Sequence, residues 1–183
     1  MKTEKIEDDK LDELEKNIIS EFESNNFNNI PHKEWKQKQW TEKINNAVGC
    51  ILRQRGYKVY ASNCKEADNG EWLYDLTGIE EKGGYFKSFP LVLESEWKGC
   101  NQKKYKDEIL YDFRKLIVSR ADHRVMIFEV GHKEKKENVV EPFLQHVRNC
   151  RHSMAGDRYL FAWWKRSKNK WIFDYSVYEV VNG

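Results

Sequence analysis

The chain has 183 residues, a length that fits one domain with a full hydrophobic core. Hydrophobic residues make up 39% of it, and no apolar run approaches the roughly 20 residues of a membrane helix, so a membrane partner is not expected. The net charge is +2, but residues 1–23 hold four lysines against nine acids, so the remainder carries +7. A basic body of this kind suits a polyanionic partner.

The N-terminus and the cysteines indicate the compartment. The first ten residues contain no apolar stretch of the kind that a secretory signal needs. The four cysteines are widely spaced and form no C-x-x-C pair, so we expect reduced thiols and no zinc ribbon. Both observations favour the cytoplasm.

Two helices are expected in the first third of the chain. Apolar residues recur at helical spacing over residues 4–23, which predicts an amphipathic helix, and Asn-rich sequence after it predicts a turn. A second helix is predicted over 31–55, with Pro31 in its first turn and Gly56 as its stop. We expect residues 1–30 to form an N-terminal helix and linker, and residues 31–183 to form one domain.

The rest of the chain alternates between strand and helix patterns. Turns at Asn69-Gly70 and Gly83-Gly84 separate three predicted strands, at residues 57–61, 72–79 and 89–97. The elements predicted after them are a helix over 103–120, a strand over 124–130, a helix over 139–150 and a C-terminal β-hairpin of strands 159–164 and 171–178. This order predicts an α/β fold with a mixed central sheet and flanking helices.

The third predicted strand carries two acids on one face. Side chains alternate along a strand, so Glu94, Glu96 and Lys98 share one side, while the apolar residues between them share the side that should face the core. Two neighbouring carboxylates repel each other unless they are solvated or held by a cation. Hard divalent cations such as Mg²⁺ prefer oxygen ligands of this kind.

The second predicted strand supplies a third acid. Asp75 lies within an apolar and aromatic stretch, and aspartate is depleted in strands and costly to bury unpaired. Pairing of the second and third strands can bring Asp75 beside Glu94. Exposed acids on a sheet face are the alternative, but the combination favours a site for Mg²⁺ or Mn²⁺ formed by Asp75, Glu94, the Ser95 carbonyl and Glu96.

These residues resemble a known family. Asp75, then Glu94-Ser95-Glu96, then a helix containing Asp112-Phe113-Arg114-Lys115-Leu116, is similar to the PD-(D/E)XK nuclease superfamily over residues 33–130. The third residue of that motif is usually lysine, and Glu96 in its place resembles the BamHI-like subgroup with its Asp…Glu-x-Glu pattern. Tyr74 stands where the proline of the superfamily's name would be.

The resemblance implies a restriction-endonuclease-like αβββαβ core and metal-dependent phosphodiester hydrolysis in DNA, with a role in restriction or phage defence and no small-molecule cofactor. Glu96 would accept the proton of the attacking water or ligate a second metal ion, and Lys98 would lie near that water or contact phosphate. The resemblance also implies that an acid on the preceding helix, Glu42, completes the site. A second register, Glu96-Trp97-Lys98, stays open because it is itself an E-x-K motif.

Two basic segments are candidates for contact with DNA. Lys103, Lys104 and Lys106 lie at the start of a predicted helix, where positive charge opposes the helix dipole, so phosphate contact explains them better than local stability. A hairpin loop combines basic residues with flanking tryptophans, a pairing that suits nucleic acids. Its basic candidates are Lys165, Arg166 and Lys168, and its tryptophans are Trp163, Trp164 and Trp171.

Three functions remain open from the sequence. The leading hypothesis is a Mg²⁺-dependent endodeoxyribonuclease, acting on double-stranded DNA and working as a symmetric homodimer. The second is a catalytically inactive module that keeps the nuclease fold and binds DNA or a protein. The third is a structural protein whose aromatic C-terminal region and acidic N-terminal segment bind another chain.

Overall fold

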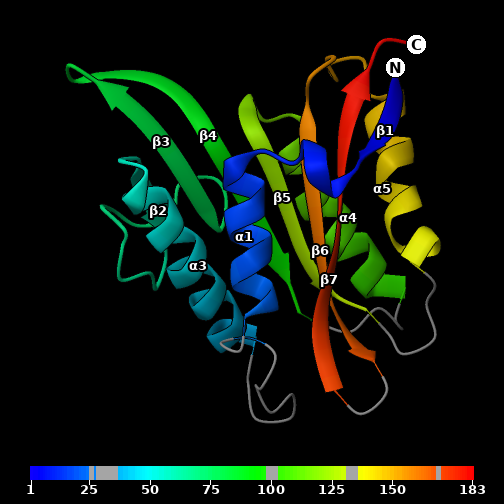
Figure 1. The fold of residues 1–183 in the computed structure, drawn as a ribbon, viewed down its shortest axis with the longest axis horizontal. Coiled ribbons are helices and arrows are strands. Elements are labelled where there is room, and N and C mark those ends of the chain that lie inside the picture. The colour runs from blue at the N-terminus through cyan, green and yellow to red at the C-terminus, as the bar shows by residue number, and fades with distance from the viewer. Residues whose placement is uncertain (25–26, 28–36, 98–102, 131–135, 168–169) are drawn as a thin grey trace.

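The computed structural model describes residues 1–24, 27, 37–97, 103–130, 136–167 and 170–183, with the side chains of 103–107 and 136–139 left undescribed. Its centre is a seven-stranded mixed sheet in the order β1-β7-β6-β5-β4-β3-β2 (Figure 1). The strands are β1 (Lys2–Ile6), β2 (Lys58–Ala61), β3 (Leu76–Lys82), β4 (Tyr85–Glu96), β5 (Ala121–Glu129), β6 (Arg158–Ser167) and β7 (Lys170–Val181). The chain is therefore an α/β protein, as the sequence predicts.

Three strands form an antiparallel meander at one end of this sheet. β2 pairs with β3 and β3 pairs with β4, both antiparallel. The turn between β3 and β4 is Gly83-Gly84, with φ of 63° and 79°. Two-residue hairpin turns with both residues at positive φ favour glycine, which explains why the predicted turn forms here.

The other half of the sheet joins strands that are distant in the sequence. β5 lies parallel to both β4 and β6, while β7 is antiparallel to β6. β1 is antiparallel to β7, so the two chain ends come together at one end of the sheet, as Figure 1 shows.

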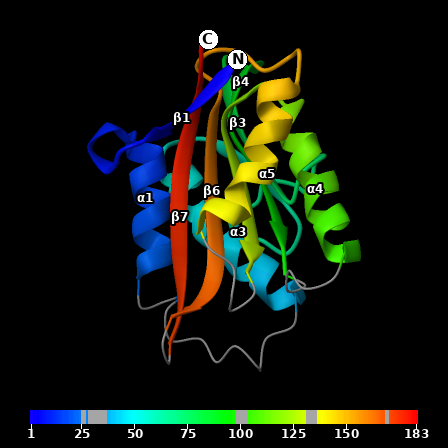
Figure 2. The same ribbon diagram turned by 90° about the vertical axis from the view of Figure 1, so that its right-hand side faces the viewer.

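Helices cover both faces of the sheet (Figure 2). On one face lie α1 (Glu13–Glu23) and α3 (Gln37–Gln54), and on the other lie α4 (Lys103–Ile117) and α5 (Lys136–Asn149). Each face has its own hydrophobic core: the first core includes Leu52 of α3 and Leu93 of β4, and the second includes Phe113 of α4 and Val92 of β4. No helix in the described part of the chain has the length and apolar character needed to span a bilayer.

The central order of elements follows the prediction. α3, β2, β3, β4, α4 and β5 succeed one another as helix, three strands, helix and strand, and the C-terminal hairpin forms from β6 and β7. Boundaries move by a few residues, as in β3, which begins at Leu76 and not at residue 72. The predicted start of the second helix, residues 31–36, lies outside the described residues.

The predicted helix over 4–23 is wrong at its N-terminal end. Residues Lys2–Ile6 are strand β1, a short 3-10 helix follows at Asp8–Lys10, and α1 begins only at Glu13. Asp12 caps α1 through a capping box, because its side chain accepts from the backbone N–H of Glu15 at 2.8 Å and Glu15 returns the bond at 3.1 Å. This cap fixes the start of the helix and leaves the preceding residues to pair with β7.

Candidate metal centre

Asp75 and Glu94 lie at the same end of the β3–β4 pair. Leu76 pairs with Leu93 at the end of this antiparallel ladder, Asp75 directly precedes Leu76, and Glu94 directly follows Leu93. Glu94 is only 3% exposed, although it is a carboxylate. The fold therefore brings together the two acids that the sequence singles out most strongly.

The Asp75 carboxylate is held by Ser95, near the end of β4. Its Oδ2 accepts hydrogen bonds from the backbone N–H of Ser95 at 2.8 Å and from Ser95 Oγ at 2.9 Å. Helix α3 supports this arrangement, because Thr41 Oγ1 lies 3.1 Å from Ser95 Oγ and Asn45 Nδ2 donates to the Asp75 carbonyl at 3.1 Å. The bonds that described residues donate to the Asp75 carboxylate both end on Oδ2.

Glu94 has a cationic partner that the sequence analysis did not assign. Nζ of Lys115, on α4, lies 2.5 Å from Glu94 Oε1 and 3.0 Å from Asp112 Oδ1. Tyr74, next to Asp75, donates its hydroxyl to the Lys115 carbonyl at 3.4 Å. The signal was present in the sequence, since Asp112 and Lys115 are one helical turn apart and belong to the motif that carries the family resemblance.

Burial dominates the electrostatics of this group. It raises the pKa of Glu94 to about 8, against the pull of Lys115 and with the help of the neighbouring Asp75 charge. It also raises the pKa of Asp75, although the two bonds from Ser95 favour the ionised form. Burial would lower the pKa of Lys115, but contacts with Glu94 and Asp112 raise it overall. Two acids that resist ionisation together are poised to gain from a bound cation.

The other residues predicted for the metal site have fewer contacts with Asp75 and Glu94. Glu96 ends β4, and its carboxylate accepts from the backbone N–H of Trp97 at 3.3 Å. Glu42 is exposed on α3 and lines a separate surface pocket, and no contact among the described residues joins it to Asp75 or Glu94. Lys98 lies outside the described residues, so both registers of the motif stay open.

The structure describes only some of the basic side chains that were predicted to contact DNA. Lys103, Lys104 and Lys106 lie in the first turns of α4, but their side chains are not described, and Lys168 lies outside the described residues. Lys165 forms an ion pair with Asp174 across the β6–β7 hairpin, whereas Arg166 is exposed. Of the tryptophans that flank this hairpin loop, Trp163 and Trp164 are buried, so they are not free to stack on bases.

Replacing Lys115 by methionine should destabilise the fold by roughly 1–3 kcal/mol, because Glu94 would stay buried without its cation. The loss should be greater at pH 9 than at pH 5, since at low pH Glu94 can take up a proton and become neutral. Urea unfolding in EDTA measures this difference.

Lys16→Met is the matched control for that substitution. Lys16 is half exposed and forms a 3.8 Å ion pair with Glu13, so its loss should change the free energy of unfolding by less than about 0.5 kcal/mol. Equal effects of the two substitutions at pH 9 would show that Lys115 does not neutralise Glu94.

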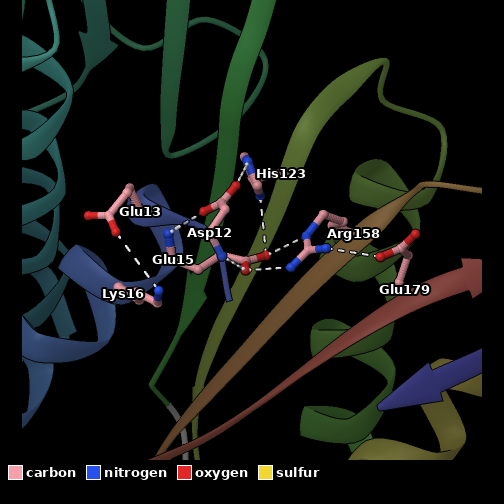
Figure 3. A network of polar contacts seen from close by, with 7 residues as sticks. All are labelled: Asp12, Glu13, Glu15, Lys16, His123, Arg158 and Glu179. Carbon is pink, nitrogen blue, oxygen red and sulfur yellow. Dashed lines mark hydrogen bonds and ion pairs between the residues drawn. The ribbon is translucent and has the colours of Figure 1, made fainter. Parts of the chain in front are cut away.

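A second polar cluster joins α1 to the middle of the sheet (Figure 3). One ligand atom from each of Asp12, Glu15 and His123 lies within 4.8 Å of the other two, a spacing that can hold a metal ion. Asp75, Glu94 and Glu96 do not reach this spacing, and within the described residues the Asp12 group alone does. No local sequence pattern indicates this group, because Glu15 and His123 are more than a hundred residues apart in the chain.

The protonation state of His123 favours ion pairing over metal binding in this second cluster. Its Nε2 lies 2.8 Å from Asp12 Oδ2 and its Nδ1 lies 3.3 Å from Glu15 Oε1. Burial alone would lower the pKa of His123, but these two carboxylates raise it to about 9, so the imidazole carries a proton on each nitrogen at neutral pH. A metal ligand must instead be the neutral imidazole.

Arg158 completes this ionic network. It donates from Nε and Nη2 to the two oxygens of Glu15 at 2.9 and 2.7 Å, and from Nη1 to Glu179 at 2.9 Å (Figure 3). Both carboxylate oxygens of Glu15 are therefore engaged. We interpret the cluster as a bridge that ties the N-terminus of α1 to β5, β6 and β7.

Comparison with known proteins adds no assignment to these sites. No protein-family model matches the chain, and no curated protein or solved structure is significantly similar to it.

Proposed function

We propose that this chain is a metal-dependent nuclease that hydrolyses phosphodiester bonds in DNA, with its centre at Asp75 and Glu94. The observation that carries the proposal is the proximity of the half-buried Asp75, directly before β3, to the buried Glu94 of β4, which follows Leu93, the ladder partner of Leu76. Burial raises the pKa of both acids, and the Asp75 charge helps to raise that of Glu94. The sequence resemblance to the PD-(D/E)XK superfamily and the order of α3, β2, β3, β4, α4 and β5 support it.

The donor set suits a hard divalent cation such as Mg²⁺ or Mn²⁺. Asp75, Glu94 and the Ser95 carbonyl would hold the ion through oxygen atoms, which Mg²⁺ prefers over nitrogen or sulfur. The ion would supply charge stabilisation at phosphate and lower the pKa of a water molecule. Ser95 orients Asp75 through two hydrogen bonds. Glu96, at the end of β4, would accept a proton from water, as the sequence resemblance implies.

Lys115 would have two successive roles in this scheme. Without a metal ion, its ammonium group lies 2.5 Å from Glu94 Oε1 and favours the ionised form of that carboxyl group. Its side chain is 35% exposed, so it can turn toward solvent or toward a phosphate when a cation takes its place beside Glu94. Lysine is well suited to this exchange because its charge lies at the end of a flexible chain.

Incubation of the purified protein with plasmid DNA tests this proposal. Cleavage is expected with Mg²⁺ or Mn²⁺ and should stop in EDTA, and Glu94→Ala should remove it. A wild-type protein that binds DNA but does not cut it with either metal would contradict the proposal and favour a binding module with a nuclease-like fold. The Lys115–Glu94 ion pair is the observation that favours this second candidate, because a permanent internal cation would replace the metal.

A further inference from the structure

An aromatic pocket is lined in part by the loop that leads to Asp75. It encloses about 420 Å³ at the outer end of the sheet, between β2, the β3–β4 hairpin and the loop that leads to Asp75. The residues that shape it are Tyr60, Asn69, Glu71, Trp72, Ile79 and Phe86. Large aromatic side chains remain open to solvent there, since Trp72 is 41% and Phe86 is 51% exposed.

The aromatic rings of the pocket are held by one another. The ring centroids of Tyr60 and Trp72 are 6.0 Å apart, those of Trp72 and Phe89 are 5.3 Å apart, and those of Phe89 and Phe86 are 4.7 Å apart. All three pairs are tilted, so the rings are not stacked face to face on one another. A flat ring entering the pocket can therefore contact several aromatic faces or edges at once.

The pocket lies on the same face of the sheet as Glu94. Val59 and Ala61 point into the first core, so Tyr60 between them points to the opposite face. Glu94 follows Leu93 of the first core and meets Lys115 of α4, which covers that opposite face. Tyr60 of the aromatic pocket and Glu94 of the proposed metal centre therefore lie on the same face of the sheet.

One short segment connects the pocket to the metal centre. Trp72 and Asp75 are three residues apart, a separation that spans at most about 10 Å of chain. Leu73 between them has a φ of 67°, a left-handed conformation that is unfavourable for leucine, and its side chain is 68% exposed. Thr77 Oγ1 holds the turn by donating to the Trp72 carbonyl at 2.9 Å. The strained turn fixes Trp72 and Asp75 in their relative positions.

The charges of the pocket select the kind of group that can enter. Among the described residues, no lysine or arginine lines it, so these residues offer no cation for a phosphate. Lys58 lies 2.7 Å from Glu81 at its border and neutralises that carboxylate, while Asn69 and Glu71 offer polar atoms at the rim. Aromatic walls with a polar rim suit a nucleobase, which stacks through its faces and forms hydrogen bonds at its edge.

We propose that this aromatic pocket binds an unpaired nucleobase of the DNA strand whose phosphodiester lies at Asp75 and Glu94. The inference rests on the proposed nuclease function and adds that the substrate is single-stranded, or has a base turned out of the duplex, at the cleavage site. A paired base stays stacked inside the duplex, so a duplex must first lose the pairing and stacking of one base to use the pocket.

Fluorescence anisotropy with a short labelled single strand in EDTA tests this inference without cleavage. Trp72→Ala and Phe86→Ala should each weaken binding of the single strand by roughly 5- to 100-fold, the effect of losing one stacked base. Binding of a fully paired duplex should change less than twofold. Trp72→Phe should restore most of the affinity, because it returns an aromatic face.

Tyr111→Ala is the matched control, since Tyr111 is a 67% exposed aromatic on α4 outside the pocket. If Trp72→Ala and Phe86→Ala bind the single strand as well as Tyr111→Ala does, or lose duplex affinity equally, the inference is overturned. A wild-type protein that binds single strands through Trp72 but cuts no DNA would contradict the nuclease proposal alone. Cleavage that is insensitive to both pocket substitutions would contradict the pocket alone.

Discussion

Replacing Glu94 by glutamine is expected to lower the rate of DNA cleavage by roughly a thousandfold or more. A neutral amide is a poor substitute for a carboxylate as a ligand of Mg²⁺, and loss of the ion removes several kcal/mol of transition-state stabilisation. Glutamine keeps the volume of glutamate, so the 3% exposed position stays filled. The measurement is the rate of conversion of supercoiled plasmid to open forms at saturating Mg²⁺.

Glu80→Gln is the matched control for this substitution. Glu80 is an exposed acid on β3 that accepts a 2.9 Å hydrogen bond from Ser88 Oγ, which a glutamine carbonyl can also accept. This variant should cut at the wild-type rate, whereas Asp75→Asn should resemble Glu94→Gln. DNA binding in EDTA should survive in all three variants. Wild-type cleavage by Glu94→Gln would place the centre elsewhere.

The order of the central helices and strands along the chain was predictable from the sequence because it depends on local patterns. The apolar run before Glu94, the Gly83-Gly84 turn and the helical spacing of α4 each act over a few residues. Strand β1 was not predictable from local patterns, because its partner β7 lies at the other end of the chain and Lys2–Ile6 forms a strand only through that pairing. The capping box at Asp12 and Glu15 was the missed local signal that α1 begins later.

Strand β4 is buried on both faces, whereas the sequence predicted that only one face would be buried. Alternation predicted one core face, with the Glu94 side turned away from the core. The structure has a core on each side, since Leu91 and Leu93 pack beneath α1 and α3 and Val92 packs beneath α4. Strands with parallel neighbours are usually covered by helices on both faces, and the crossover through α4 places the second cover here. Burial is why Glu94 needs Lys115.

The site residues that could not be predicted from the sequence are those that meet only through pairing of elements distant in the chain. Asp75 and Glu94 were predictable as neighbours because a short hairpin joins their strands. His123 and Arg158 were not, because they meet only when β5 and β6 align and α1 docks on them. A single histidine in a strand pattern carries no sign of the two acids that will surround it.

Stability of the wild-type protein should fall as the pH rises from about 6.5 through 9, in part because His123 loses its proton. Its pKa is about 9 in the folded chain and 6.5 in the unfolded chain, so its contribution is complete below pH 6.5 and is lost as the pH passes 9. The difference corresponds to roughly 3 kcal/mol, since each pKa unit is worth about 1.4 kcal/mol. Urea unfolding at a series of pH values measures the loss.

The comparison with His123→Gln isolates this contribution. Glu94 titrates in the same range with the same sign, because its folded pKa of about 8 is also raised, so the wild-type curve alone mixes the two groups. His123→Gln should be less stable than wild type at pH 6 and approach it at pH 10, while His152→Gln, at an exposed position after α5, should follow the wild-type curve. A gap between wild type and His123→Gln that stays constant with pH would mean that His123 contributes packing alone. A gap that closes with rising pH is the result expected of a protonated imidazole held between Asp12 and Glu15.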